Sequence, residues 1–195
     1  MERGFFDAIE DNEVQTIPLS IGLELVRRFH YSRGGSNTAT YRHGLVERKT
    51  GRVVGVALWI PPTKTAAMAN YPKGDWTRVL VLSRLAIDPS VPKNGASFLL
   101  GASEKMIRKD GKYEYLLTYA DEWRGHSGTI YRATNWDYLG RTAPEDVWVN
   151  SEGRMMGRKR GPKTLTRSDM ENLGFVNQGK YAKHRFGKYI GRSKK

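Results

Sequence analysis

The sequence contains no cysteine among its 195 residues. This absence excludes disulfide bonds, thiolate-ligated zinc and a cysteine nucleophile. Long apolar runs are also missing, and none approaches the roughly 20 residues that a membrane-spanning helix needs. The first residues, MERGFFDAIEDNEV, lack the basic stretch followed by an apolar stretch that marks a secretory signal. We therefore expect a cytoplasmic protein that has no membrane as a partner.

Acidic residues become scarce in the last quarter of the chain. Residues 151–195 hold 13 Lys and Arg against 3 Asp and Glu, whereas residues 1–150 hold 20 against 17. A solvated tail would explain this charge, but Phe175, Tyr181, Phe186 and Tyr189 are interleaved with it. Cations contact phosphates and aromatic rings stack on bases, so the pattern favours nucleic acid. We expect a catalytic core over residues 1–150 and a basic extension over 151–195 that carries the last strand, packs on the core and contacts DNA.

The apolar patterns predict an order of elements that alternates in the second half of the chain. A helix of about ten residues follows Ser20, a predicted N-cap, and a β-hairpin turns at Thr50 and Gly51. The segment TKTAAMANYPKGDWT is expected to be a loop. Strands are predicted in RVLVLSRLAID, KYEYLLTYAD, WDYLGRT and KHRFGKYIG. A helix in ASFLLGASEKMIRKDG follows the first of these strands, a short helix in SGTIYRATN follows the second, and a short helix in TRSDMENL follows the third.

This order predicts an α/β (α+β) fold. Alternation of strand and helix requires parallel pairing through a crossover, and the hairpin adds antiparallel strands. We expect a mixed, mostly antiparallel sheet with a parallel central pair and helices on both faces. The length suits a single hydrophobic core.

A loop between the long strand and the longest helix is the first candidate site. Gly95 and the small residues Ala96 and Ser97 would let backbone N–H groups approach an anion at the helix start, and Lys93 would add charge. A turn that binds nothing is the simpler alternative. The arrangement resembles the GNAT acetyltransferase superfamily, whose R/Q-x-x-G-x-G/A loop cradles the coenzyme A pyrophosphate. Here the aligned residues are Pro92–Ser97, with Pro92 where that family has Arg or Gln.

That resemblance implies a cofactor site. The segment IYRATNWDYLG is similar to the superfamily's terminal helix and strand, with Tyr131 at the tyrosine position and Asn135 where glycine is usual. Acetyl-CoA or a related acyl-CoA would then bind at a set of six residues, Lys93, Asn94, Gly95, Ala96, Ser97 and Tyr131.

A second group of polar residues lies at the ends of predicted elements. His30 and Tyr31 end the first helix, Ser83 and Arg84 interrupt the most apolar strand, and Asp121 follows the next strand directly. Ligands of open α/β sheets bind beyond the carboxyl ends of strands. A buried arginine needs a partner, which Asp121 or a ligand anion would supply. The alternatives are a packing histidine, an arginine paired with a surface carboxylate, and an aspartate that caps the turn ADEWRGHSG.

The chain as a whole resembles the bacteriophage Mom DNA-modification family. The similarity is carried by HYSRGGSNTATYRHGLVE, VLVLSRLAID, LLTYADEWRGHSGTIYRATNWDYLG and KHRFGKYIG. It implies a GNAT-like enzyme that converts adenine in double-stranded DNA to a carbamoylmethyl derivative at the exocyclic amine, which protects phage DNA from host restriction. The implied catalytic residues are His30, Tyr31, Ser83, Arg84 and Asp121. The resemblance also implies that an iron ion is bound, with His30 and Asp121 as candidate ligands.

Adenine in a duplex must be flipped out to reach a snug site. Tyr31, Trp123 or Trp136 would stack on it, and either Asp121 or His30 would take the amine proton. The predicted DNA contacts are Trp123, Arg124, Arg158, Lys159, Arg160, Lys163, Lys183 and Arg185. Two other functions remain open: an acyl-CoA-dependent N-acetyltransferase of a small amine or protein, and a non-catalytic DNA-binding protein on the same scaffold. The sequence leaves the donor and the oligomeric state open, a homodimer included.

Overall fold

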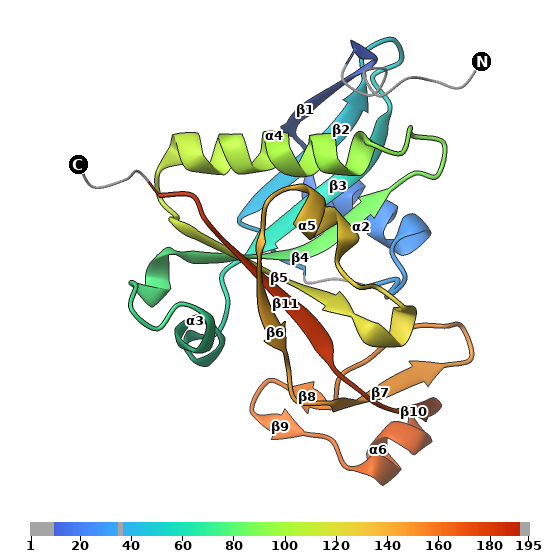
Figure 1. Ribbon diagram of the computed structural model, residues 1–195. Coiled ribbons are helices and arrows are strands. Elements are labelled where there is room, and N and C mark those ends of the chain that lie inside the picture. Colours follow the sequence, from blue (N-terminus) through green and yellow to red (C-terminus); the bar gives the residue numbers. More distant parts are fainter. Residues whose placement is uncertain (1–9, 35–36, 192–195) are drawn as a thin grey trace.

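The computed structural model describes residues 10–34 and 37–191, and its centre is a mixed seven-stranded sheet (Figure 1). Every neighbouring pair in this sheet is antiparallel except β4 and β5, which are parallel. In spatial order the strands are β1 (Asn12–Thr16), β2 (Tyr41–Glu47), β3 (Val53–Ile60), β4 (Val79–Ile87), β5 (Tyr115–Asp121), β11 (Lys183–Tyr189) and β6 (Asp137–Arg141). The predicted fold class, with its central parallel pair, is confirmed.

The parallel pair follows from the sequence between its strands. β4 is almost entirely apolar, as suits an interior strand, and the 16-residue helix α4 (Gly95–Asp110) supplies the crossover to β5. Gly111 ends α4 in the left-handed conformation at φ 74°, as the glycine C-cap predicted.

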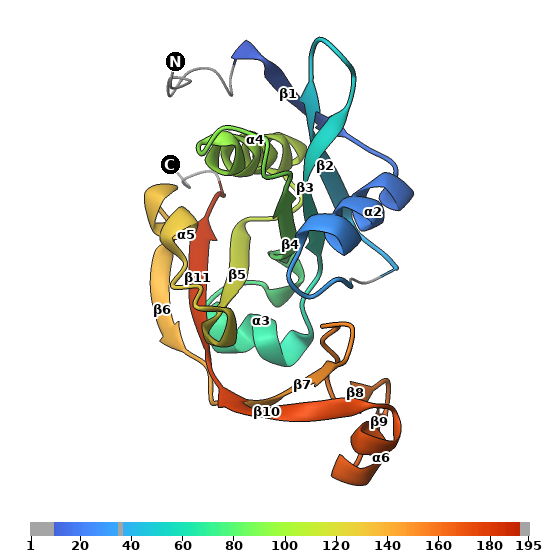
Figure 2. The same ribbon diagram turned by 90° about the vertical axis from the view of Figure 1, so that its right-hand side faces the viewer.

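Helices cover both faces of the sheet (Figure 2). On one face, α2 (Leu19–Phe29) packs on Val56, Leu58 and Ala86, and α3 (Lys64–Asn70) packs on the β4 and β5 side chains of the same face. On the other face, α4 and α5 (Thr129–Ala133) enclose the largest core cluster, which includes Leu80 and Leu116. The two-faced packing explains why the central strands are apolar on both sides.

The chain leaves the main sheet after β6 and builds a small unit over residues 145–181, here named the insertion. Its elements are β7 (Glu145–Asn150), β8 (Lys159–Arg160), β9 (Lys163–Thr164), α6 (Arg167–Asn172) and β10 (Phe175–Tyr181). β7 pairs with β10, β8 with β9, and Trp148, Met170 and Phe175 form a core of their own. The chain then returns as β11 between β5 and β6. The boundary expected at residue 150 therefore falls inside the insertion, and the last strand belongs to the main sheet.

Several local predictions were wrong. The segment after Thr63 is not a loop, because the Thr63 side chain accepts the Ala66 N–H and caps α3, whose residues are good helix formers. α2 begins at Leu19 after Pro18 and has no side-chain cap, so Ser20 lies inside the helix. The sequence interpretation also missed β1 and the strands of the insertion, which are short or interrupted by glycine.

None of the helices in residues 10–34 and 37–191 is long and apolar enough to cross a membrane.

Candidate active site

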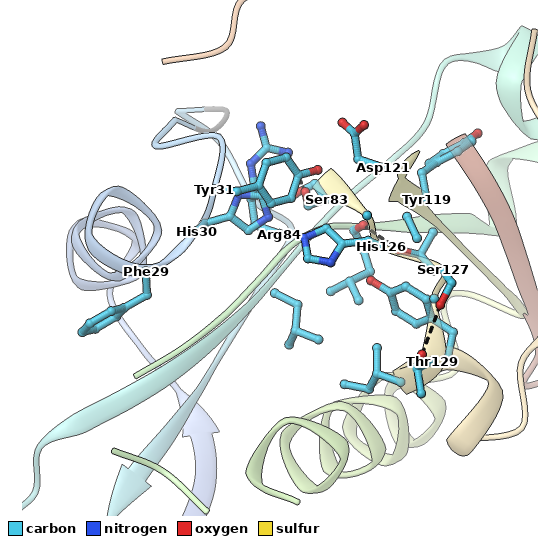
Figure 3. A pocket seen from close by; sticks show the side chains of 18 of the residues that line it. Phe29, His30, Tyr31, Ser83, Arg84, Tyr119, Asp121, His126, Ser127 and Thr129 are labelled. Carbon is cyan, nitrogen blue, oxygen red and sulfur yellow. Dashed lines mark hydrogen bonds between the residues drawn. The ribbon is translucent and has the colours of Figure 1, made fainter. Parts of the chain in front are cut away.

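A cavity of about 600 Å³ lies where β4 and β5 part (Figure 3). Their parallel pairing ends at Leu82 and Thr118, after which β4 continues beside β3 and β5 beside β11. Residues from both strands, from the end of α2 and from the loop before α5 line the opening. We name it the large cavity.

The large cavity brings together the five predicted catalytic residues, which come from three distant parts of the chain. His30, Tyr31, Ser83, Arg84 and Asp121 all line it. It is also lined by Tyr131, which the sequence assigned to a cofactor, and by His126, which the sequence interpretation left as a solvated turn residue.

His30 ends α2 and is held by the residues that follow it. Its Nδ1 accepts the backbone N–H of Ser32 at 3.2 Å and lies 2.8 Å from the Ser32 hydroxyl. An acceptor at Nδ1 places the proton of the neutral ring on Nε2. Burial, Arg84 and His126 lower the pKa of His30 to about 3. The ring is therefore neutral at pH 7 and is a weak proton acceptor.

Tyr31 stacks on His30, with ring centroids 4.3 Å apart, and its ring lies 5.3 Å from that of His126 (Figure 3). Burial, and secondarily the Asp121 carboxylate, raises the pKa of Tyr31 to about 12. The phenol therefore stays protonated and can donate a hydrogen bond. The guanidinium of Arg124 lies 5.7 Å from its ring and brings a second cation to the rim.

Ser83 is the extra residue of a β-bulge. Leu58 pairs with Arg84 and Trp59 with Leu82, so Ser83 has no opposite residue on β3. The Ser83 hydroxyl donates to the Leu58 carbonyl at 3.0 Å. Bulges occur beside active sites because they redirect a side chain, and here the bulge precedes Arg84.

Arg84 is a partly buried cation whose observed partners are backbone carbonyls. Its Nε donates to the Gly34 carbonyl at 2.7 Å, and its Nη1 donates to the Ser83 carbonyl at 2.5 Å. In the described part of the chain it forms no ion pair with Asp121 or a surface carboxylate, so both expected pairings were wrong. Burial lowers the pKa of Arg84, yet a guanidinium remains charged in a protein. A desolvated positive charge therefore faces the large cavity without a compensating carboxylate.

Asp121 ends β5 and caps the 3-10 helix η2 (Glu122–Arg124). Its Oδ1 accepts the Trp123 N–H at 3.1 Å, so the capping role considered from the sequence is real. The side chain is 3% exposed. The cap occupies one carboxylate oxygen and fixes the rotamer, which leaves Oδ2 for a ligand. One residue thus combines a structural contact with a position at the cavity wall.

Two glycines shape the loop that carries His126, Ser127 and Thr129 to the cavity. Gly125 and Gly128 adopt φ of 70° and 77°, and a Cβ on Gly128 would lie 2.2 Å from the Phe186 ring. This spacing of glycines was visible in the sequence and could have drawn attention to His126. The side chains of Ser127 and Thr129 hydrogen-bond to each other at 3.2 Å.

Trp136 does not reach the site. It is 4% exposed, its ring packs near Trp59, and its Nε1–H donates to Glu104 at 2.7 Å. The prediction that it stacks on a base was therefore wrong. Trp123 remains partly exposed, with the Arg124 guanidinium 4.0 Å from its ring.

The predicted cofactor loop lies apart from the large cavity. Lys93, Asn94, Gly95, Ala96 and Ser97 start α4 as expected, but none lines that cavity. A Cβ on Gly95 would lie 2.2 Å from Val91, so this side chain fills the space that the glycine leaves. A separate hollow beside Val91 and Pro92 is lined by Asp11, Glu47 and Lys49. Acyl-CoA binding at this loop therefore stays a prediction.

The predicted DNA contacts divide into two groups. Lys159, Arg160 and Lys163 are exposed on the β8–β9 hairpin, and Arg124 is exposed at the rim of the large cavity. Lys183 lines smaller cavities beside it.

Two of the predicted DNA contacts are engaged inside the protein. Arg185 donates to Asn70 and to the Leu139 carbonyl, which holds it inside the fold. Arg158 donates to the Leu165 carbonyl and lies 3.9 Å from Asp146. The sequence charge therefore overstates the cations available to a phosphate.

Within the described residues, no group of three or more His, Asp or Glu side chains could hold a metal ion. The iron expected from the family resemblance, with His30 and Asp121 as ligands, is unsupported.

Comparison with known proteins gives a family match and a structural likeness. The Mom protein family matches residues 11–189. The methylcarbamoylase mom of Escherichia phage Mu is 26% identical over 131 residues, which are 65% of this chain and 53% of that protein. The aligned region thus spans about half the length of this curated relative.

Solved acetyltransferases share the fold at low identity. The spermidine/spermine N-acetyltransferase SpeG of Vibrio cholerae, in complex with manganese ions, gives a TM-score of 0.57 at 9% identity, over 94% of this chain and 95% of that one. An N-acetyltransferase of Staphylococcus aureus Mu50 gives a TM-score of 0.55 at 12% identity, over 92% of this chain and 98% of that one. The protein yncA of Salmonella typhimurium, solved with its cofactor acetyl-CoA, gives a TM-score of 0.55 at 8% identity, over 94% of this chain and 96% of that one. At these identities the likeness shows the fold alone.

Proposed function

The chain belongs to the Mom protein family, and from this we propose that it is a phage DNA-modification enzyme that carbamoylmethylates adenine in double-stranded DNA. One observation carries the proposal. In a chain that matches this family, His30, Tyr31, Arg84 and Asp121 line a single cavity where β4 and β5 part. The likeness to the phage Mu methylcarbamoylase supports carbamoylmethyl as the transferred group.

The chemistry demands a base and a held electrophile. The exocyclic amine of adenine is a weak nucleophile, because its lone pair is delocalised into the ring. Its proton must therefore leave as the new bond forms, and both reactants must be aligned. In the proposed step the amine nitrogen attacks the methylene carbon of a carbamoylmethyl donor. The donor's leaving group departs with its bonding electrons, and the amine proton passes to Asp121.

Asp121 is the better base of the two candidates. His30 has a pKa of about 3, and its Nδ1 already accepts the Ser32 N–H. Asp121 keeps Oδ2 for the amine while Oδ1 holds the cap. His30 then acts as a neutral donor through Nε2–H, and Tyr31 donates through its phenol.

Arg84 supplies the positive charge of the site. A guanidinium that is buried without a carboxylate stabilises negative charge that develops on a leaving group or carbonyl oxygen. We assign it this role toward the donor. The donor itself is left unassigned, because the α4 loop at which an acyl-CoA is predicted to bind does not line the large cavity.

The test is nucleoside mass spectrometry of DNA from cells that express the protein. We expect a modified deoxyadenosine whose added mass equals one carbamoylmethyl group. Asp121→Asn is the test variant for the base, because its amide oxygen can still accept the Trp123 N–H and keep the cap. Loss of the base should lower the product about 10²–10⁴-fold.

Three results would contradict the proposal. Unmodified DNA from cells with folded wild-type protein would favour a non-catalytic DNA-binding protein. An acetylated small amine or protein would favour an ordinary N-acetyltransferase. Full product from Asp121→Asn would remove Asp121 as the base.

A further inference from the structure

A second cavity, of about 370 Å³, lies between the core and the insertion. We name it the insertion cavity. Its core-side wall includes Tyr31, Arg84 and Asp121, which also line the large cavity. Its other wall comes from the insertion and includes Trp148 and Tyr181. The two cavities therefore meet at the proposed reaction centre, and the smaller one still has the size of a small-molecule site.

The insertion is held against the core, so this wall is part of the folded structure. Arg33 follows α2 and donates from Nη1 to the Glu152 carbonyl, in the turn after β7, at 3.0 Å. Trp148 packs with Met170 and Phe175, which anchors its ring from behind. A ring with packed neighbours forms a firm wall for a ligand.

Trp148 carries a buried donor without an acceptor. It is 2% exposed, it lines the insertion cavity, and its Nε1–H has no hydrogen-bond partner among the described residues. The other buried indoles are satisfied: Trp59 donates to Ser103 at 2.8 Å and Trp136 to Glu104 at 2.7 Å. An unmet buried N–H is unfavourable, and a ligand acceptor would remove that cost.

The charges around the insertion cavity suit a nucleotide. Arg154, Arg160 and Lys183 line it beside the carboxylates of Glu145 and Asp146, and the cations attract the phosphates that flank a base. In Figure 3 the Asp121 carboxylate points away from His126 and Thr129, which belong to the large cavity alone. The proposed base is therefore directed away from the far wall of the large cavity.

We propose that the insertion cavity binds the adenine flipped out of the duplex, while the large cavity binds the donor. This inference rests on the proposed function. Trp148 Nε1–H donates to a ring nitrogen of adenine, and Asp121 accepts from the exocyclic amine. Guanine presents an oxygen, O6, at the position of that amine, so it would face the Asp121 carboxylate with a second acceptor. The insertion thus sets the choice of base.

The indole N–H resonances of the five tryptophans test this assignment. The probe is dAMP, titrated into the ¹⁵N-labelled full-length protein, with dGMP as the control nucleotide. We expect the Trp148 indole proton to move downfield with dAMP and not with dGMP. The Trp59 and Trp136 indole peaks should stay in place, because their hydrogen bonds are already made. Trp148→Phe identifies the peak.

A second measurement uses the modified nucleoside. Trp148→Phe keeps an aromatic ring but removes the donor together with part of the indole, so the product should fall at least about tenfold, which is the effect of one buried hydrogen bond. Trp76→Phe is the matched control, because Trp76 is 38% exposed and lines neither cavity. It should leave the product unchanged.

The outcomes separate this inference from the proposed function. A Trp148 indole peak that stays in place, in a protein whose expression yields modified adenine, overturns the pocket assignment alone. Shifts confined to His126, Ser127 and Thr129 would place the base in the large cavity and overturn it as well. Absence of modified adenine in wild-type DNA is instead a failure of the proposed function.

Discussion

Arg84 is unfavourable for stability, and it occupies the position of a proposed functional residue. Its partial burial without a carboxylate is unfavourable, since the charge loses much of its solvent and gains only backbone carbonyls. Stability alone would favour an apolar residue at this point of an apolar strand. We therefore propose that the positive charge is retained to bind a ligand in the large cavity.

Arg84→Met should separate these two effects. The variant keeps an unbranched stem and removes the charge, so we expect the free energy of unfolding to stay within about 1 kcal/mol of wild type or to rise. The modified adenine should fall by about 10²-fold or more, because charge stabilisation in the transition state is lost. Urea denaturation and nucleoside mass spectrometry measure the two quantities. A loss of stability without a loss of product would make Arg84 a structural residue.

His43 predicts how stability depends on pH. It is buried against Ser103, with Nδ1 and Oγ 2.6 Å apart, and burial lowers its pKa to about 4 from an unfolded value near 6.5. Between these values the unfolded chain binds the proton and the folded chain does not. Stability is therefore complete above pH 6.5 and declines as the pH falls toward 4, by about 1.4 kcal/mol per unit of pH.

His43→Gln should flatten this decline, as measured by urea denaturation between pH 7 and pH 4.5. His30, with its pKa of about 3, contributes in the same direction and continues below pH 4. An unchanged slope in His43→Gln would mean that His43 does not control the acid sensitivity.

At the scale of elements, the loop between β5 and α5 forms one wall of the large cavity. It turns through Gly125 and Gly128, both at positive φ, but their surroundings differ. A Cβ at Gly128 would strike Phe186, whereas at Gly125 nothing lies within 4 Å. The wall therefore depends on one close contact between backbone and ring.

Gly128→Ala introduces both backbone strain and the clash with Phe186, whereas Gly125→Ala introduces the backbone strain alone. Both variants place alanine at positive φ, which costs about 1–2 kcal/mol. Gly128→Ala should lose about 1–3 kcal/mol more, because an overpacked core must shift. Thermal unfolding measures the difference. Equal melting temperatures would show that Phe186 yields freely and does not set the loop.

At the scale of the whole molecule, the β8–β9 hairpin of the insertion and α4 lie at opposite ends of the protein (Figures 1 and 2). Lys159, Arg160 and Lys163 are exposed on the hairpin, and Lys105, Arg108 and Lys109 are exposed on α4. Only the hairpin belongs to the unit that forms the insertion cavity. DNA that presents a base there would place phosphates near the hairpin.

Replacing the three hairpin cations with glutamine should weaken DNA binding and flatten its dependence on salt. Each lost phosphate contact lowers the slope of log K against log salt concentration by about 0.9. The matching triple replacement on α4 removes the same charge and should leave the slope unchanged. Equal effects of the two triple variants would place the DNA elsewhere.

The sequence by itself determined most of the central sheet, the helix between its parallel strands and the polar residues of the candidate site. Apolar runs and glycine turns are local properties, so β4, α4 and the hairpin were predictable. The departure of Pro92 from the coenzyme A loop was visible as well. His30, Arg84 and Asp121 could be singled out because polar residues at the ends of apolar elements need a partner or a ligand.

Only the tertiary structure decided how these residues are used. Arg84 has no carboxylate partner, Trp136 lies in the core and Arg185 is bound inside the fold, because each depends on contacts between segments distant in the chain. The basic end of the sequence is divided between a strand inside the sheet and an insertion beside the site. The insertion cavity exists because residues 145–181 fold back against the end of α2, and no local pattern records that approach.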